Sequence, residues 1–202
     1  MIVWGGFGIG SIEENTGGRY CAQPSTPLVQ SAVSRKTHGN AGSWDVNLPL
    51  SGTPGVECRS GGATNDYTLL VTFLANVSVN GNPQVAVTSG IGAIGSGGLS
   101  NGGVVMTSGN VVTIPLTNVA NAQTISVTLN NVNGSTNMTI PMRLLIGDVN
   151  GDGFVNSGDA LQTRNRSGQL TDATNYRSDV NADGFVNSGD AIIVRARSGT
   201  GL

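Results

Sequence analysis

Apolar and polar side chains alternate along much of residues 31–147, which is the pattern of half-buried β-strands. Segment 44–50 places Trp44, Val46, Leu48 and Leu50 on one face. Segment 67–73 does the same with four apolar side chains: Tyr67, Leu69, Val71 and Phe73. Further strand candidates are 83–89, 103–107, 110–116, 123–129 and 136–146.

Glycine and asparagine pairs separate these segments. Turn signals occur at 80–83, Gly97-Gly98, Gly102-Gly103 and Asn133-Gly134. About seven short strands with this punctuation predict a mainly β fold, an antiparallel immunoglobulin-like β-sandwich followed by a small α-helical domain. The Gly-rich segment 90–103 lacks the lysine and the strand–helix context of a phosphate-binding loop, so we expect a hairpin or a flexible loop there.

Three regions follow from the changes in pattern along the chain. Residues 1–30 are Gly-rich and then polar, and we expect an extended N-terminal arm whose apolar residues within 1–10 dock on this domain or on a neighbour. Those first ten residues lack the basic and apolar regions of a signal peptide. Residues 31–147 are the predicted β-sandwich domain, and residues 148–202 have a different character.

An internal repeat defines this last region. Residues 148–168 and 179–199 read DVNGDGFVNSGDALQTRNRSG and DVNADGFVNSGDAIIVRARSG and agree at 16 of 21 positions. Each copy continues past its Asp-Ala pair into a predicted short helix, which Gly168 or Gly199 closes as a C-cap. Residues 171–178 are a candidate linking helix, with Thr171 as its N-cap.

The start of each repeat fits an EF-hand-type calcium loop. Ca²⁺ takes six to eight oxygen ligands, which such a loop supplies from positions 1, 3, 5, 7, 9 and 12. In the first loop, 148–159, these are Asp148, Asn150, Asp152, the Phe154 carbonyl, Asn156 and Asp159. In the second loop, 179–190, they are Asp179, Asn181, Asp183, the Phe185 carbonyl, Asn187 and Asp190.

The remaining loop positions support the same interpretation. Position 6, which must turn sharply, is Gly153 or Gly184, and position 8 is an inward-pointing valine. We expect these valines, Val155 and Val186, to face one another and join the loops. The alternative is a pair of Asp/Asn/Gly turns without metal, and the repetition of the whole motif argues against it.

Composition and charge agree with this picture. The chain has 31 glycines, 11% charged residues and 4% aromatic residues, which suits short strands and tight turns better than a helical bundle. No basic patch suggests nucleic acid, and no apolar run is long enough to cross a membrane. Six of the 12 acidic residues lie in the two loops, so two Ca²⁺ ions would change the formal net charge from −2 to about +2.

The sequence offers little for catalysis. The single histidine, His38, stands in a polar stretch that we interpret as surface, and no serine is accompanied by a nucleophile-elbow motif or a base. We therefore expect no enzymatic activity. The two cysteines, Cys21 and Cys58, suit one disulfide in an oxidising compartment, with two unpaired thiols as the alternative.

With its paired loops, the Asp at position 12 of each, and a helix after each loop, segment 148–202 resembles the type I dockerin domain. The preceding β-domain resembles the immunoglobulin-like module found before such domains in secreted bacterial proteins. The resemblance implies an extracellular or cell-surface protein that binds a cohesin, which is a β-sandwich domain. It also implies partner contacts at loop positions 10 and 11 and on the following helix. Those are Ser157, Gly158, Ser188, Gly189, Arg164 and Arg195, with Arg166 and Arg197 beside them. Both glycines depart from the second hydroxyl residue that is common in the family.

Three functions follow from these expectations. The first is a calcium-dependent structural or interaction protein, in which the dockerin-like module of one copy binds the sandwich of the next and builds a filament or tube. The second is a carbohydrate-binding or adhesive module that is anchored through its dockerin to a cohesin-bearing scaffold. That function needs exposed planar aromatics, for which the sandwich offers mainly Trp44 and Tyr67, both in alternating strands. The third is a hydrolase without a recognisable motif.

Overall fold

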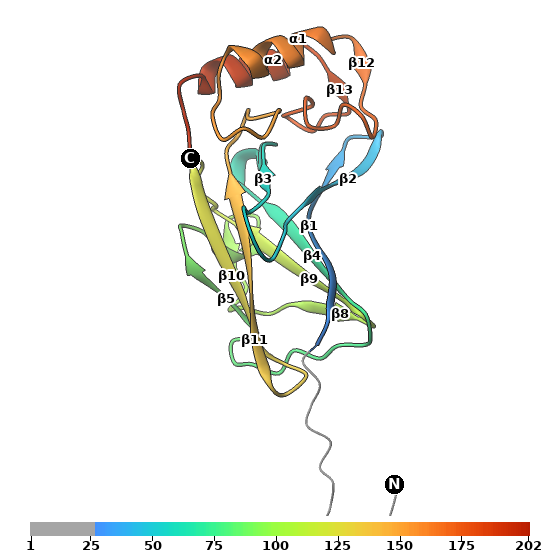
Figure 1. Ribbon diagram of the computed structural model, residues 1–202, viewed down its shortest axis with the longest axis vertical. Coiled ribbons are helices and arrows are strands. Elements are labelled where there is room, and N and C mark those ends of the chain that lie inside the picture. Colours follow the sequence, from blue (N-terminus) through green and yellow to red (C-terminus); the bar gives the residue numbers. More distant parts are fainter. Residues whose placement is uncertain (1–26) are drawn as a thin grey trace, which may run out of the picture.

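Two β-sheets packed face to face form the main body of residues 27–202, which a computed structural model describes (Figure 1). The first sheet has the order β2-β1-β4-β9-β6-β7, with β8 paired to β9. Its strands are β1 Val29–His38, β2 Gly42–Asn47, β4 Tyr67–Phe73, β6 Ala93–Ser96, β7 Leu99–Ser100, β8 Met106–Ser108 and β9 Val111–Thr117. The second sheet has the order β3-β11-β10-β5. Its strands are β3 Val56–Glu57, β5 Val85–Ser89, β10 Gln123–Val132 and β11 Thr136–Leu144.

The predicted mainly β, immunoglobulin-like sandwich is therefore confirmed. Neighbouring strands are antiparallel, apart from the short β3, which pairs with β11 in parallel. A 3₁₀ turn, η1 Gly62–Thr64, precedes β4. The small C-terminal part holds α1 Ser157–Asn165, β12 Gln169–Leu170, β13 Phe185–Val186 and α2 Ser188–Arg197. It lies across one end of the sandwich, with both helices outermost (Figure 1). In the described residues, no helix is both long and apolar enough to cross a membrane.

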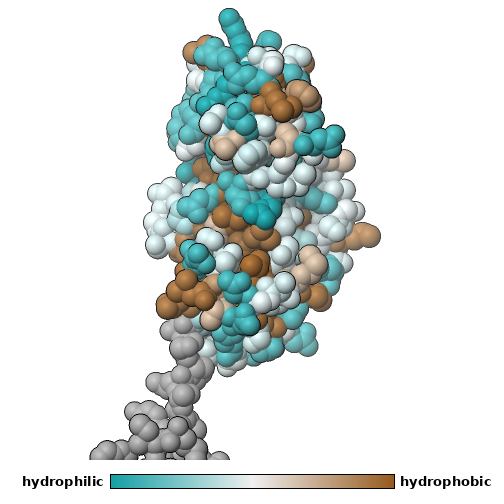
Figure 2. Space-filling view, turned by 90° about the vertical axis from the view of Figure 1, so that its right-hand side faces the viewer, coloured by the Kyte–Doolittle hydropathy of each residue, from teal (hydrophilic) through white to brown (hydrophobic). Residues whose placement is uncertain are grey.

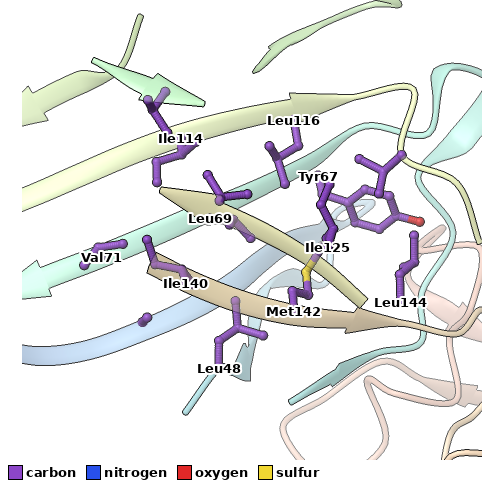
Figure 3. Close-up of a cluster of buried hydrophobic side chains, with 14 of the residues drawn as sticks. Leu48, Tyr67, Leu69, Val71, Ile114, Leu116, Ile125, Ile140, Met142 and Leu144 are labelled. Atoms are coloured by element: carbon purple, nitrogen blue, oxygen red, sulfur yellow. The ribbon is translucent and has the colours of Figure 1, made fainter. Parts of the chain in front are cut away.

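The core between the sheets follows the alternation in the sequence (Figure 3). All four inward residues predicted for segment 67–73 are buried, in one cluster with residues of the neighbouring strand β9 and of β10 and β11 in the facing sheet. In segment 44–50, Val46 and Leu48 are buried, whereas Leu50 is 39% exposed. Strand β2 ends at Asn47, so the alternation no longer dictates where Leu50 points.

The Gly-rich segment 90–103 contains a hairpin, which was one of the two structures predicted for it. Strands β6 and β7 pair across the two-residue turn Gly97-Gly98, and both glycines have positive φ. Two positive φ values in succession are the signature of the tight turns that match strand twist, and glycine adopts them without strain. Asn133 and Gly134 form the corresponding turn between β10 and β11.

The alternation of apolar and polar residues does not predict strand β1, because the inward residues of this strand are largely polar. Ser34 and His38 are fully buried there. Both lie beside a buried ion pair from the segment around β3, in which Arg59 Nη2 is 2.7 Å from Glu57 Oε2. Arg59 also donates to the main-chain oxygens of Ser34 and Trp44 at 3.0 and 2.8 Å. The ion pair therefore ties β1, β2 and β3 together inside the sandwich.

Cys58 stands between the two members of this ion pair and is fully buried. Its thiol donates a hydrogen bond to the Arg177 carbonyl at 3.5 Å, and burial raises the pKa of the thiol to about 11. The other cysteine, Cys21, and the apolar arm 1–10 lie outside the described residues. The disulfide and the docking of the arm stay predictions.

The buried ion pair predicts a particular acid sensitivity. Burial opposes the charge of Glu57, but the Arg59 guanidinium and the hydrogen bonds to the carboxylate outweigh it and lower the pKa of Glu57 from 4.5 to about 2. A lowered pKa means stabilisation that is fully present above pH 4.5 and is lost as the pH falls through 2. Glu57→Gln should cost on the order of 3 kcal/mol at neutral pH. The measurement is the free energy of unfolding of the wild type and the variant, obtained with denaturant in saturating calcium. The difference between the two proteins should shrink as the pH falls below 4.5 towards 2.

The matched control is the exposed pair of Arg35 and Asp45, whose atoms are equally close at 2.7 Å. Asp45→Asn should change stability by less than about 1 kcal/mol, because solvent screens an exposed pair. Equal losses of unfolding free energy in both variants would contradict this account. So would a loss for Glu57→Gln that does not change with pH.

Candidate calcium sites

The first loop wraps the amides of its own backbone around the side-chain oxygens of its predicted ligands. Asn150 Oδ1 accepts from Asp152 N at 2.9 Å, and Asp152 Oδ1 accepts from Phe154 N at 2.9 Å. Asn156 Oδ1 accepts from Gly158 N at 2.6 Å. Each bond closes a short Asx-type turn, which is how Asp and Asn bend a backbone in steps of two residues. Residues 150–158 therefore curve around one centre.

Asp159, at position 12, closes this curve from the first turn of α1. Its two carboxylate oxygens accept from Asn150 N at 3.2 Å and Asn156 N at 2.9 Å. Together with the Asn156 side chain this makes a capping box at the helix start. These two bonds explain locally why position 12 is Asp rather than the more usual Glu. The Asp159 carboxylate contacts the N-cap amide of Asn156 and the amide of Asn150 near the start of the loop at the same time.

The second loop repeats these contacts almost bond for bond. Asp190 accepts from Asn181 N at 3.0 Å and Asn187 N at 2.8 Å, and it forms the capping box of α2. At position 6, Gly153 and Gly184 have φ of 93° and 100°, the left-handed region in which a side chain is strained. The predicted turn glycines are therefore where the backbone requires them.

The donor set fits a hard cation. In the described residues, no three His, Cys, Asp or Glu side chains gather around one point, so each loop needs its asparagine and backbone oxygens as well. Burial raises the pKa of Asp148, backbone bonds from Gly153 and Gly151 lower it, and the Asp159 and Asp152 carboxylates raise it again, with a net increase. Asp190 shows the same net increase, led by burial. A bound Ca²⁺ would supply the positive charge that these buried carboxylates lack.

The prediction that Val155 and Val186 pair with each other is wrong. Val155 exchanges backbone hydrogen bonds with the segment after α2, donating to Thr200 O and accepting from Gly199 N. Val186 lies in β13, which pairs with β12 after α1. Each loop is therefore closed by the chain that leaves the other repeat's helix, so the two repeats interlock.

The predicted linking helix at 171–178 is absent, and the segment consists of turns. Asp172 Oδ1 accepts from the amides of Thr174 and Asn175, so Asp172 takes the capping role that we assigned to Thr171. Thr171 is buried, and its hydroxyl donates to Asp179 Oδ2 at 2.6 Å. A side chain that holds a loop carboxylate is thus not available to start a helix.

The comparisons with known proteins bear on this region. Residues 146–197 match the family model described as the dockerin type I domain. The C-terminal part of the chain is a type I dockerin domain. The expected resemblance is confirmed, and with it a calcium-binding module of protein–protein interaction. No curated protein and no solved structure matches the chain.

The residues implied as partner contacts stand on the outer side of the dockerin. Ser157, Ser188, Arg164 and Arg195 are exposed, at equivalent places of the two repeats. Gly158 and Gly189 are the second residues of their helices, and a Cβ there would lie 3.0 Å from the N-cap Oδ1 of Asn156 or Asn187. This close approach favours glycine at both positions. Of the neighbouring arginines, Arg166 donates to Ser178 Oγ at 3.2 Å.

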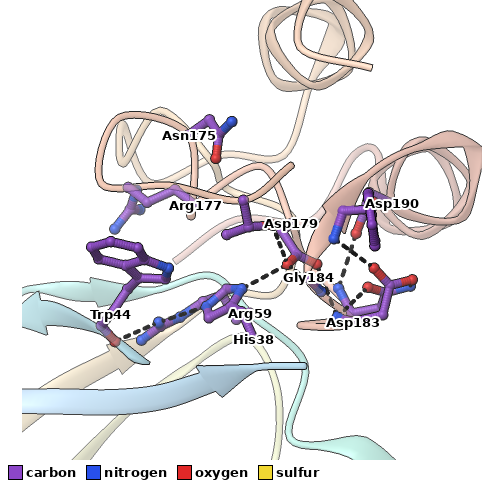
Figure 4. A network of polar contacts seen from close by, with 12 residues as sticks. His38, Trp44, Arg59, Asn175, Arg177, Asp179, Asp183, Gly184 and Asp190 are labelled. Atoms are coloured by element: carbon purple, nitrogen blue, oxygen red, sulfur yellow. Dashed lines mark hydrogen bonds and ion pairs between the residues drawn. The ribbon is translucent and has the colours of Figure 1, made fainter. Parts of the chain in front are cut away.

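His38 is the site residue that the sequence did not reveal. Its interpretation as a surface residue is wrong, because its side chain is fully buried and Nδ1 lies 2.8 Å from Asp179 Oδ2 (Figure 4). The two residues are 141 positions apart, and no local motif connects them. Only the packing of the dockerin against the β1–β2 turn brings them together.

Calcium titration of single-site variants tests the two loops. Asp152→Asn and Asp183→Asn each remove one exposed ligand charge without touching a capping box, and each should weaken one of two sites by roughly tenfold or more. Asp172→Asn changes the charge equally outside the loops and should still bind two ions. The readout is isothermal titration calorimetry. Binding that is unchanged in all three variants would place the metal elsewhere.

Proposed function

We propose that this chain is a non-enzymatic, extracellular calcium-binding interaction protein, which docks a β-sandwich partner through its dockerin domain with two Ca²⁺ ions bound. The observation that carries the proposal is the outer face of the dockerin. Helices α1 and α2 turn this face away from the sandwich, and each starts directly from a calcium loop (Figure 1). Metal binding would therefore fix the helix starts and prepare the face for docking.

The two repeats present this face in duplicate. Leu161 on α1 and Ile192 on α2 are 55% and 64% exposed at equivalent positions. Each has an exposed serine before it and an exposed arginine after it. An apolar centre with polar and guanidinium neighbours is the composition of protein-binding surfaces. On the side shown in Figure 2 the helical end is mainly hydrophilic, which favours a small, specific contact.

The described sandwich residues support an interaction role over catalysis or carbohydrate binding. Tyr67 is 4% exposed, and Trp44 is half-buried and stacks on Tyr176 with ring centroids 6.2 Å apart. Tyr67 therefore has no open face for a sugar ring, and Tyr176 already occupies one face of Trp44. His38 donates into the calcium loop rather than toward a cleft. The alternative of a carbohydrate-binding module anchored by its dockerin therefore has less support than a structural role.

The partner is a cohesin-like domain or the sandwich of another copy of this chain. The second case is a head-to-tail contact between two different surfaces, which repeats without closing and gives a filament or tube. The dockerin touches its own sandwich through the second loop, through Tyr176 and Arg177, and where Gly153 of the first loop lies against Arg143. These contacts leave the helix face available.

Light scattering and electron microscopy with and without Ca²⁺ test self-assembly. The wild-type protein should form polymers in calcium that EDTA disperses. The double variant Leu161→Glu/Ile192→Glu should stay monomeric, because charge on both helices removes both copies of the face. Leu99→Glu, at a position 75% exposed in the sandwich hairpin, tests the other side of the contact, and assembly that survives this change places the docking surface outside the hairpin.

Monomers in both conditions would exclude self-assembly and leave the cohesin-like partner. Binding of a purified cohesin domain, measured by biolayer interferometry with the same variants, then decides that case. Binding to neither in calcium would contradict the proposed function.

A further inference from the structure

The first ligands of the two calcium loops have different surroundings, although the loops are nearly identical in sequence. In the first loop, Asp148 accepts only loop amides, from Gly151, Asp152 and Gly153. In the second loop, Asp179 Oδ2 accepts from the Gly184 amide at 2.9 Å and from two side chains as well. These are the Thr171 hydroxyl at 2.6 Å and His38 Nδ1 at 2.8 Å.

Both extra donors are specific to the second loop. Thr171 follows α1, and its counterpart after α2 is Leu202, which has no hydroxyl. The backbone contacts of the two are equivalent, because Thr171 N donates to Gly184 O and Leu202 N donates to Gly153 O. His38 has no counterpart, since it comes from the end of β1 in the sandwich. The two repeats therefore differ at the carboxylate of Asp179, which has two side-chain donors that Asp148 lacks.

The neighbours of His38 assign its hydrogen. Nε2 lies 3.1 Å from Arg59 Nη1, and a guanidinium can only donate, so Nε2 accepts. The ring hydrogen is then on Nδ1 and points at Asp179. On its Nε2 side the ring meets Arg59 (Figure 4), whose ion pair with Glu57 is fully buried, so the ring cannot shift without disturbing that pair. His38 is a fixed donor.

The backbone holds the second loop against the sandwich at the same place. Gly39 N donates to Ala182 O at 3.0 Å, and Ser60 N donates to Val180 O at 2.7 Å. A Cβ on Gly39, whose φ is 48°, would collide with the Asp183 carbonyl. The second loop is thus in direct backbone contact with the β1–β2 turn at Gly39 and with the segment after β3 at Ser60.

We propose that His38 is a positioning residue for the second calcium site and couples that site to the β-sandwich. With three hydrogen bonds, Oδ2 of Asp179 has no room for a further ligand, so the carboxylate offers Oδ1 to the metal in one fixed orientation. In the first site the corresponding carboxylate, Asp148, accepts from loop amides and from no side chain of the sandwich. Calcium in the second loop therefore stabilises the contact between that loop and the β1–β2 turn, and calcium in the first loop does not act through this contact. This inference rests on the proposed function, in which both loops bind calcium.

Single-site backgrounds separate the two loops in the full chain. Asp152→Asn isolates the second site and Asp183→Asn isolates the first. Adding His38→Phe, which keeps an aromatic ring and removes both nitrogens, should weaken calcium binding at the second site by about ten- to a hundredfold. The first site should change by less than about twofold. His38→Asn returns a donor near the place of Nδ1 and should restore part of the affinity.

Thr171→Val covers the case in which the histidine variants do not fold. It removes the second donor to the same oxygen, away from the buried ion pair, and should also weaken only the second site. Thr200→Val is the matched control, since that hydroxyl donates to Arg197 O and touches neither loop carboxylate. Hydrogen exchange at the Gly39 and Ser60 amides gives an independent readout. Calcium should slow it in the Asp152→Asn background and not in the Asp183→Asn background.

The outcomes are distinguishable. If neither background binds calcium with His38 intact, the proposed function fails. If both bind, and His38→Phe and Thr171→Val leave the second site unchanged or weaken both sites equally, the role of His38 is wrong. Selective weakening of the second site, with loss of the calcium effect on exchange at Gly39, establishes it.

Discussion

The fully buried guanidinium of Arg59 is the constraint on which the arrangement of this molecule depends. A charge removed from water is tolerated only when it is paired and its donors are satisfied. Arg59 meets this condition with Glu57 and with main-chain oxygens of β1 and β2, which forces the inner face of β1 to be polar. His38 completes the set and extends it to Asp179. One buried charge thus places the β1–β2 turn beneath the second calcium loop.

Residues 176 and 177 strengthen the same junction from the dockerin side. Arg177 donates to the carbonyls of Val56, Val149 and Asp148, and these bonds join the sandwich to the start of the first calcium loop. Tyr176 donates to Asp45 O at 3.0 Å and lies over Arg59, whose guanidinium carbon is 5.5 Å from the ring centroid. These contacts replace water around polar groups that would otherwise be buried without partners. The dockerin and the sandwich therefore share one polar interior.

The features that the sequence predicted are those with local causes. The loop ligands, the turn glycines and the hairpin at Gly97-Gly98 each depend on residues a few positions apart, so spacing alone identifies them. The features that it missed depend on distant parts of the chain. Strand β1 lacks an apolar face because its partners are Glu57 and Arg59. The exposure of Leu50 depends on where β2 ends, and the position of Val155 on the chain after α2. The role of His38 cannot be predicted from its neighbours in the sequence, because its partner Asp179 is 141 residues away.

The shared interior also limits how the dockerin can present a partner. Only a few residues separate the end of β11 at Leu144 from the first ligand at Asp148, and Gly147 N donates to Cys58 O within them. No flexible linker lies between the two domains, so the helix face keeps one orientation relative to the sandwich. A dockerin on a flexible linker samples many orientations and does not impose a geometry on an assembly. In the proposed head-to-tail assembly, a dockerin fixed in this way would transmit its orientation to the next subunit, because each contact would repeat the same rotation and translation. The junction at His38 would therefore set the geometry of any polymer, while the helix face would set its affinity.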